Sequence, residues 1–276
     1  MSRTDQACSS RVTSERASRR AFAGVVALLF ASSAAATVIW CAPMAQMGAM
    51  PMPGGWTMSM AWMRMPGQAW PDVAMSFLGM WVLMMVAMML PALVPMLWRY
   101  REDMRRIGQG RTDWLTVLVA SGYFCVWTLL GVVVFVLGVV LAAIEMQQPA
   151  LSRAVPAAVG AVVLTAGVLQ LTAWKARQLA CCRKQAWCAR TLQATHAAAW
   201  RQGLWLGLRC CSCCGNLMLV SLAIGVMDLR AMAVVAAAIT AERLAPAGER
   251  VACAIGVVVV GSGLYLLATA INVPLS

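Results

Sequence analysis

Methionine is concentrated in one part of the chain. Fifteen of the 21 methionines lie between Met44 and Met96, in a loop broken by prolines and glycines and in the apolar segment after it. The loop contains Met44, Met47, Met50, Met52, Met58, Met60, Met63 and Met65. Flexible methionines fill gaps in apolar cores, but a loop has no core to fill. Because the neutral thioether binds soft ions, Cu(I) above all, the loop indicates capture of a soft metal. The alternative is an interfacial segment whose Met and Trp side chains lie among lipid headgroups.

The apolar segment after the loop repeats methionine at helical spacing. Met80, Met84 and Met88 recur every four residues and stack along one side of a helix, with Met85 and Met89 in the adjacent row. Two thioethers one turn apart can share an ion, so these rows suggest a relay. Packing filler is the alternative.

A second group of soft ligands is formed by Cys210, Cys211, Cys213 and Cys214, which contain two overlapping C-x-x-C pairs. This spacing brings two sulfurs within reach of one ion, and the neighbouring Arg209 favours the thiolate. The pattern indicates a metal or redox role. Structural zinc is disfavoured because no second C-x-x-C or His pair follows at finger spacing. Weaker candidate ligands are Cys181 and Cys182 in the preceding loop and Glu242 at the end of an apolar segment.

The composition predicts that these residues lie in a membrane protein. The chain is 62% hydrophobic and 12% charged, whereas a soluble domain is about 45–50% apolar and about 25% charged. Several gaps between charges reach the roughly 20 residues that cross a bilayer. We predict an all-α transmembrane bundle of six or seven spans, at about 21–40, 75–98, 114–141, 154–174, 203–227, 229–245 and 251–271. The span at 229–245 is the weakest, and Gly203 and Gly207 predict close helix packing.

Basic residues predict the orientation of these spans. Eighteen of the 22 Lys and Arg lie in the N-terminal tail and in the loops after the second, fourth and sixth spans, and three lie on the opposite side. The positive-inside rule then places the N-terminus in the cytoplasm and the protein in the plasma (inner) membrane as a multi-pass protein. The net charge of +12 follows from this asymmetry and requires no nucleic-acid partner.

The domain organisation is simple. We expect residues 1–20 to form a disordered basic cytoplasmic tail and residues 21–276 to form one membrane domain. Within that domain, residues 41–74 form the Met-rich extracytoplasmic loop. The first span is expected to be an uncleaved anchor, because its charged tail and apolar run are longer than those of a typical signal peptide.

Several segments resemble a known family. The motifs are Trp81-x2-Met84 with Met88-Met89-x-Pro91, Tyr123-x3-Trp127, Gln170-Leu171-Thr172-x2-Lys175, Gly207-x2-Cys210-x2-Cys213-Cys214 and Glu242-Arg243-x2-Pro246. As a set they resemble the DUF2182 family of predicted metal-binding membrane proteins, over roughly residues 75–270. Asn216 and Arg243 depart from the family pattern, which usually has Trp and Lys there. The resemblance implies a metal link, often labelled copper, and no mechanism.

These observations lead to a Cu(I)-handling membrane protein, either a transporter or a membrane-bound copper chaperone, with the lipid bilayer, the ion and a copper-carrying protein as partners. The Met-rich loop would capture Cu(I), the Met80–Met84–Met88 row would conduct it, and the cysteines would receive it. The spans carrying the row and the cysteines should then pack side by side. The alternatives are a membrane thiol-disulfide oxidoreductase using the C-x-x-C pairs and a non-catalytic membrane subunit. No Walker motif is present, so ATP hydrolysis is not expected.

Overall fold

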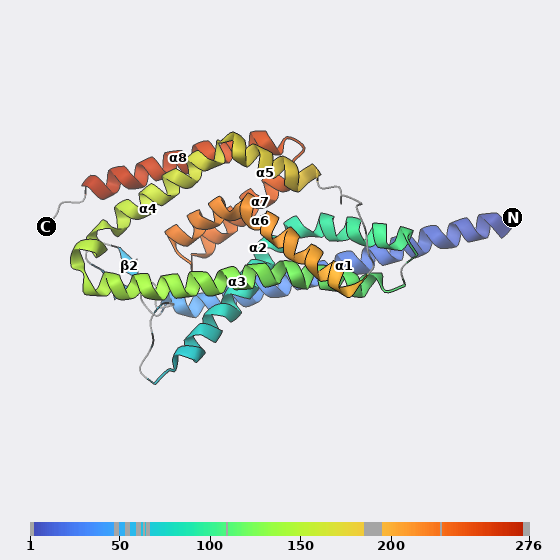
Figure 1. The fold of residues 1–276 in the computed structure, drawn as a ribbon, viewed down its shortest axis with the longest axis horizontal. Helices are drawn as coiled ribbons and strands as arrows, with labels where there is room; N and C mark the ends of the chain where they lie inside the picture. Colours follow the sequence, from blue (N-terminus) through green and yellow to red (C-terminus); the bar gives the residue numbers. More distant parts are fainter. Residues whose placement is uncertain are drawn as a thin grey trace.

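Long helices account for almost all of the structure (Figure 1). The computed structural model describes residues 3–46, 50–52, 56–58, 62, 64, 67–108, 110–184, 195–226 and 228–272. The helices are α1 Arg3–Gln46, α2 Trp70–Arg106, α3 Thr112–Gln147, α4 Pro149–Gln170, α5 Ala173–Lys184, α6 His196–Ile224, α7 Leu229–Leu244 and α8 Gly248–Asn272. Between α1 and α2, β1 (Met50–Pro51) pairs antiparallel with β2 (Thr57–Met58). The predicted all-α class is confirmed.

Six of these helices are long and apolar enough to cross a membrane: Arg16–Cys41 within α1, and α2, α3, α4, α6 and α8. They correspond to six of the seven expected spans. The seventh expected span, 229–245, forms helix α7 of 16 residues. At 1.5 Å per residue α7 is about 24 Å long, less than the roughly 30 Å of a hydrocarbon core, so by length it does not qualify as a full span.

The first helix extends further than the sequence suggested. α1 begins at Arg3, so residues 3–20, expected to be disordered, have helical backbone. The physical reason is continuity: this segment contains neither Pro nor Gly, and the apolar span after it provides helical turns from which the helix can extend.

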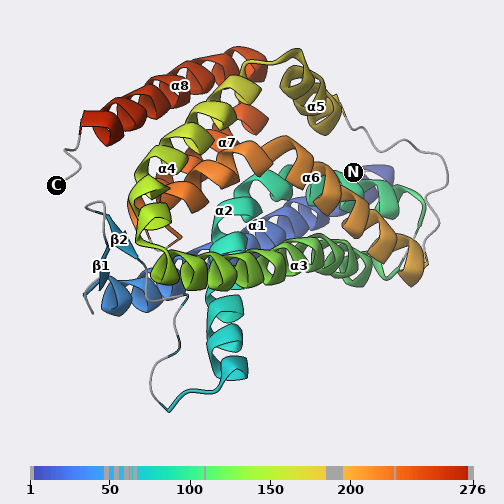
Figure 2. The ribbon, with the colours of Figure 1, turned by 60° about the vertical axis from the view of Figure 1, so that its left-hand side comes forward.

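Two helix pairs make the closest backbone contacts, and glycine permits both. A Cβ atom on Gly203 of α6 would lie 2.2 Å from the backbone oxygen of Val119 in α3. A Cβ atom on Gly167 of α4 would lie 2.7 Å from the backbone nitrogen of Val260 in α8. The packing role predicted for Gly203 is therefore confirmed, and that for Gly207 likewise, since its Cβ would lie 2.9 Å from Val126. Helices α3 and α6 pack closely (Figure 2), and Cys210 of α6 is hydrogen-bonded to Tyr123 of α3.

The structure brings two of the basic groups together. Arg101 of α2 donates to the backbone oxygen of Ser18 in α1, and Arg19 lies over the ring of Trp98 in α2. The basic start of α1 therefore lies beside the basic end of α2. The α3–α4 turn lies at the other end of the molecule, toward the C-terminus (Figure 1). This arrangement is the one that the positive-inside rule requires.

Reporter fusions check the orientation. We expect fusions ending at residues 60 and 147 to show high alkaline phosphatase activity, because both ends would lie outside the cytoplasm. A fusion ending at residue 105, among the arginines of α2, should be inactive as a phosphatase but fluorescent as a fusion to a cytoplasmic fluorescent protein. The same side for residues 60 and 105 would contradict the predicted topology.

Candidate metal centre

The cysteines of α6 lie in the middle of the helix and divide into two groups. Cys210, Cys213 and Cys214 are 0%, 0% and 1% exposed. Each residue advances about 100° around a helix, so these three share the face that packs into the core. Cys211 lies about 100° from Cys210 and is only half-buried. The structure thus buries three of the four predicted cysteines together and leaves Cys211 half-buried at the edge of this face.

Two sulfurs have a separation suited to a shared ion. Cys210 Sγ and Cys214 Sγ are 3.8 Å apart. With sulfur–metal bonds of about 2.3 Å, two ligands lie about 3.8 Å apart around a tetrahedral ion and about 4.6 Å apart around a linear one. The pair can therefore bind an ion after a shift of less than about 1 Å. Among the described residues, no three Cys, His, Asp or Glu side chains form a ready metal-binding group. A two-sulfur site suits a soft monovalent ion better than structural zinc, which takes four protein ligands.

Tyr123 of α3 completes one side of this pair. Its hydroxyl donates a hydrogen bond to Cys210 Sγ at 3.0 Å, and the tyrosine is fully buried. A hydrogen bond donated to sulfur favours the charged thiolate over the neutral thiol. The hydroxyl therefore favours the metal-binding form of Cys210.

Arg243, near the end of α7, supplies positive charge. The residue is 8% exposed and interacts electrostatically with the sulfurs of Cys210, Cys214 and Cys182. Within the described residues, its Nε and Nη1 atoms have no hydrogen-bond partner. A buried guanidinium without a counter-ion is costly. Cu(I) held by two thiolates carries one negative charge, which would balance Arg243.

Cys182 of α5 adds a further thiol. It is 3% exposed, and its Sγ lies 3.6 Å from the backbone oxygen of Arg209. A hydrogen bond with Cys213 and the nearby Arg243 guanidinium lower the pKa of the Cys182 thiol to about 7, although burial acts to raise it. Its neighbour Cys181 is exposed. Of the two cysteines among the weaker candidates, Cys182 therefore lies against the cysteines of α6 and Cys181 does not.

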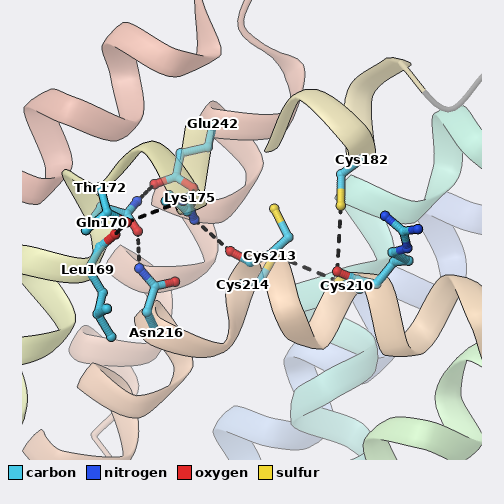
Figure 3. A network of polar contacts seen from close by, with 11 residues as sticks. Leu169, Gln170, Thr172, Lys175, Cys182, Cys210, Cys213, Cys214, Asn216 and Glu242 are labelled. Carbon is cyan, nitrogen blue, oxygen red and sulfur yellow. Dashed lines mark hydrogen bonds and ion pairs between the residues drawn. The ribbon is translucent and has the colours of Figure 1, made fainter. Parts of the chain in front are cut away.

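A buried polar network lies on the other side of these cysteines (Figure 3). Lys175 Nζ forms an ion pair with Glu242 Oε2 at 2.8 Å and donates to the backbone oxygen of Cys213 at 2.7 Å. Gln170 donates to Glu242 Oε1, and Asn216 donates to Gln170. Both carboxylate oxygens of Glu242 are thus engaged within the protein. The network joins α4, α5, α6 and α7 around Cys213.

The methionine row faces the protein interior. Met80, Met84 and Met88 are 2%, 3% and 3% exposed, and Met85 and Met89 are 1% and 0% exposed. All five belong to one contiguous buried cluster that also contains Cys210, Cys213 and Cys214. The row therefore faces the protein interior and not lipid, and a relay of Cu(I) requires this orientation.

The helices that carry the two clusters are not direct backbone neighbours. Among the described residues, α2 packs mainly on α3, α1 and α7, while α6 packs mainly on α3 and α4. The expected side-by-side packing of the two spans is therefore incomplete. Instead α2 packs on α3, where the fully buried Trp81 donates from Nε1 to the backbone oxygen of Trp127 at 2.8 Å. The clusters connect through side chains instead, since Met96 of α2 lines the same cavity as Cys182 and Arg243.

Most of the Met-rich loop lies outside the described residues. Met47, Met60, Met63 and Met65 are not described, nor are the side chains of Met44, Met50 and Met58. Met52 is half-buried, and its backbone nitrogen donates to Trp56. The neighbouring Trp62 packs on Phe77, with ring centroids 5.1 Å apart. Because Phe77 precedes Met80 by less than one turn, this loop meets α2 at the beginning of the methionine row.

Three contributors to the site were not among the predicted ligands. Tyr123 and Arg243 lie far from the cysteines in sequence, and only the tertiary fold brings them close. Met218 is 3% exposed and extends the Cys210–Cys214 row by one further turn of α6. Four-residue spacing could have identified Met218, and a polar group inside an apolar span could have identified Tyr123.

In its described residues, the protein is all-helical with six membrane-compatible helices. Its core holds a thiol cluster, formed by Cys182, Cys210, Cys213 and Cys214, together with buried thioethers. The family model described as "PpoB2: Copper chaperone" matches residues 78–266, well over half of the chain. The chain therefore belongs to this copper-related family. The match covers α3 to α7, most of α2 and α8, and every cysteine of the cluster. No curated protein and no solved structure matches the chain. The copper link implied by the resemblance to DUF2182 is thus supported.

Proposed function

We propose that this protein is a membrane-embedded Cu(I) chaperone that holds one ion between Cys210 and Cys214 and passes it on without enzymatic chemistry. The observation that carries the proposal is the buried sulfur pair, 3.8 Å apart, with a hydroxyl donor on one sulfur and a guanidinium nearby. Both features stabilise the thiolates that bind Cu(I). Membership of a copper chaperone family supports the same metal.

The methionines provide the route to this pair. In the expected orientation, the Met-rich loop and the start of α2 face outside, where thioethers bind Cu(I) without losing a proton. Cu(I) would move along Met80, Met84 and Met88 and reach the cysteines, which bind it more tightly as thiolates. A bare cation in hydrocarbon is costly, so the burial of this row inside the protein supports a conducting role. The gradient from thioether to thiolate favours movement toward the cytoplasm.

The arrangement of the cysteines gives less support to a thiol-disulfide oxidoreductase. In reactive C-x-x-C pairs, a helix N-terminus or a nearby cation lowers the pKa of the attacking thiol, and this thiol needs access to a disulfide partner. Here the pairs lie 14 or more residues from the start of α6 at His196. Arg243 provides a nearby cation, but Cys210, Cys213 and Cys214 are almost completely buried. A small ion can reach such sulfurs, whereas a protein disulfide cannot.

Metal titration of the purified protein tests the proposal. Under anaerobic conditions we expect one Cu(I) per chain to remain bound in the presence of a chromogenic Cu(I) chelator, with sulfur as the nearest neighbour in X-ray absorption spectra. Ag(I), which is also soft and monovalent, should compete for the site. Zn(II) should not, because no three Cys, His, Asp or Glu side chains among the described residues form a ready metal-binding group, and structural zinc takes four protein ligands. Stoichiometric Zn(II) binding with no retained Cu(I) would refute the proposal.

A further inference from the structure

A cavity of about 260 Å³ opens beside the thiol cluster, between α2, α5 and α7. Its walls include Met96 and Arg99 of α2, Cys182 of α5, and Arg243 and Leu244 of α7. Cys182 is the one sulfur of the cluster that lines it, and it is hydrogen-bonded to Cys213. A ligand in this cavity would therefore touch Cys182 and would reach the other sulfurs only through it.

The charge of the cavity is positive. Arg99 is exposed, and within the described residues it forms no ion pair with a carboxylate, while Arg243 is buried with two unpartnered nitrogens. Among the described residues, no Asp or Glu lines the cavity. The adjacent Glu242 is already paired with Lys175. The two nitrogens of this buried guanidinium that lack a hydrogen-bond partner favour an anionic ligand, and guanidinium groups bind carboxylates with two parallel hydrogen bonds.

The cavity is small. Pockets for drug-sized ligands hold about 300–1,000 Å³, so this one suits a compact metabolite rather than a segment of a protein. It lies at the end of the molecule where the positive-inside rule places the cytoplasm, with Arg99 seven residues before the end of α2. A small anion from the cytoplasm could enter past Arg99 and reach Cys182.

We propose that this cavity binds a small anionic thiol that exchanges Cu(I) with Cys182. The proposal rests on the Cu(I) chaperone function proposed above. The carboxylates of the carrier would pair with Arg99 and Arg243, and its sulfur would lie against Cys182 and the thioether of Met96. This makes the cavity the cytoplasmic exchange port of the thiol cluster.

The exchange is a ligand substitution in which copper stays Cu(I). The carrier enters as a Cu(I) bis-thiolate. The Cys182 sulfur forms a bond to copper as one carrier sulfur–copper bond breaks, and that carrier molecule leaves as a thiolate while the second stays bound. Where Cys182 begins as a thiol, its proton passes to the departing thiolate. Cys213 displaces the second carrier thiolate in the same way. Cys210 and Cys214 then displace Cys182 and Cys213, which take up the protons that the incoming thiols lose, and release follows the reverse order.

Loading kinetics test the port. Purified protein is mixed under anaerobic conditions with Cu(I)–glutathione, with Cu(I)–glutathione dimethyl ester, whose carboxylates are blocked, or with tetrakis(acetonitrile)copper(I). We expect wild-type protein to load about tenfold faster from glutathione than from the ester, since a charge-assisted hydrogen bond contributes on this order. Arg99→Gln should remove most of this preference while leaving loading from the ester and from the acetonitrile complex unchanged.

Arg106→Gln is the matched control, because Arg106 is also exposed on α2 but does not line the cavity. It should retain the full preference for glutathione. Equal loading from glutathione and its ester would overturn the port, as would equal losses in the Arg99→Gln and Arg106→Gln proteins, which would indicate general surface charge. Failure to take up copper even from the acetonitrile complex would overturn the chaperone function together with the port. Uptake from that complex without a glutathione preference would overturn the port alone.

Discussion

The Cys210→Ser/Cys214→Ser protein is expected to lose Cu(I) retention by more than 100-fold relative to wild type. The two sulfurs lie 3.8 Å apart in the core, with Tyr123 donating to one of them. Serine preserves the side-chain shape but replaces soft thiolate ligands with hard hydroxyls, which bind Cu(I) poorly. Changes outside the ligand shell of a metal already cost about 10–100-fold in affinity, so loss of both ligands should exceed this. Competition with a chromogenic Cu(I) chelator measures the effect.

Cys211→Ser is the matched control for this double substitution. Cys211 lies in the same helix, next to the cluster in sequence, but points about 100° away from Cys210. The Cys211→Ser protein should retain copper as wild type does. Comparable losses in the Cys211→Ser and the double-substituted proteins would show that the C-x-x-C pattern acts through all four cysteines and would contradict the two-sulfur site.

The position of Cys211 shows how much of the site could be predicted from the sequence. The spacing of the cysteines predicted a metal site, but helical periodicity alone does not single out Cys211, which lies about 100° from Cys210 and only about 60° from Cys214. The burial of Cys210, Cys213 and Cys214, with Cys211 left half-buried, is a property of the packed bundle. Likewise, the sequence indicated the methionine row, but the burial of Met84 among aromatic residues is a property of the packed bundle.

The apolar helices were the most predictable part of the fold, since their length and composition are set by the bilayer. Helix α7 was less predictable because its 16 residues end in Glu242 and Arg243, whose burial depends on partners from other helices. Arg243 reaches the sulfurs of α5 and α6, and Glu242 reaches Lys175, 67 residues earlier. No local pattern encodes such pairings, which is why Glu242 appeared in the sequence as a possible ligand and in the structure as a partner of Lys175.

This pairing leads to a second large effect, on stability. We expect Lys175→Met to lower the free energy of unfolding in detergent by about 3–5 kcal/mol, the range for removing one partner of a buried ion pair. Lys175 is 0% exposed and Glu242 is 1% exposed. Removing the ammonium group leaves the carboxylate buried with Gln170 as its one remaining hydrogen-bond donor in the described part of the chain, and deprives the backbone oxygen of Cys213 of its contact with Lys175. Thermal unfolding of the purified protein measures the loss.

A second substitution separates the buried charge from the lost packing. In the Lys175→Met/Glu242→Gln protein neither charge of this pair remains, and the amide oxygen at position 242 can still accept from Gln170. Methionine fills much of the volume of the lysine side chain. Most of the lost stability should therefore return, because replacing both partners of a buried pair is often close to neutral. If the double variant is as unstable as Lys175→Met, the contact between Lys175 and the Cys213 backbone, rather than the charge pair, stabilises this part of the bundle. Copper retention should then fall together with stability, since that contact fixes the turn of α6 from which Cys213 and Cys214 project.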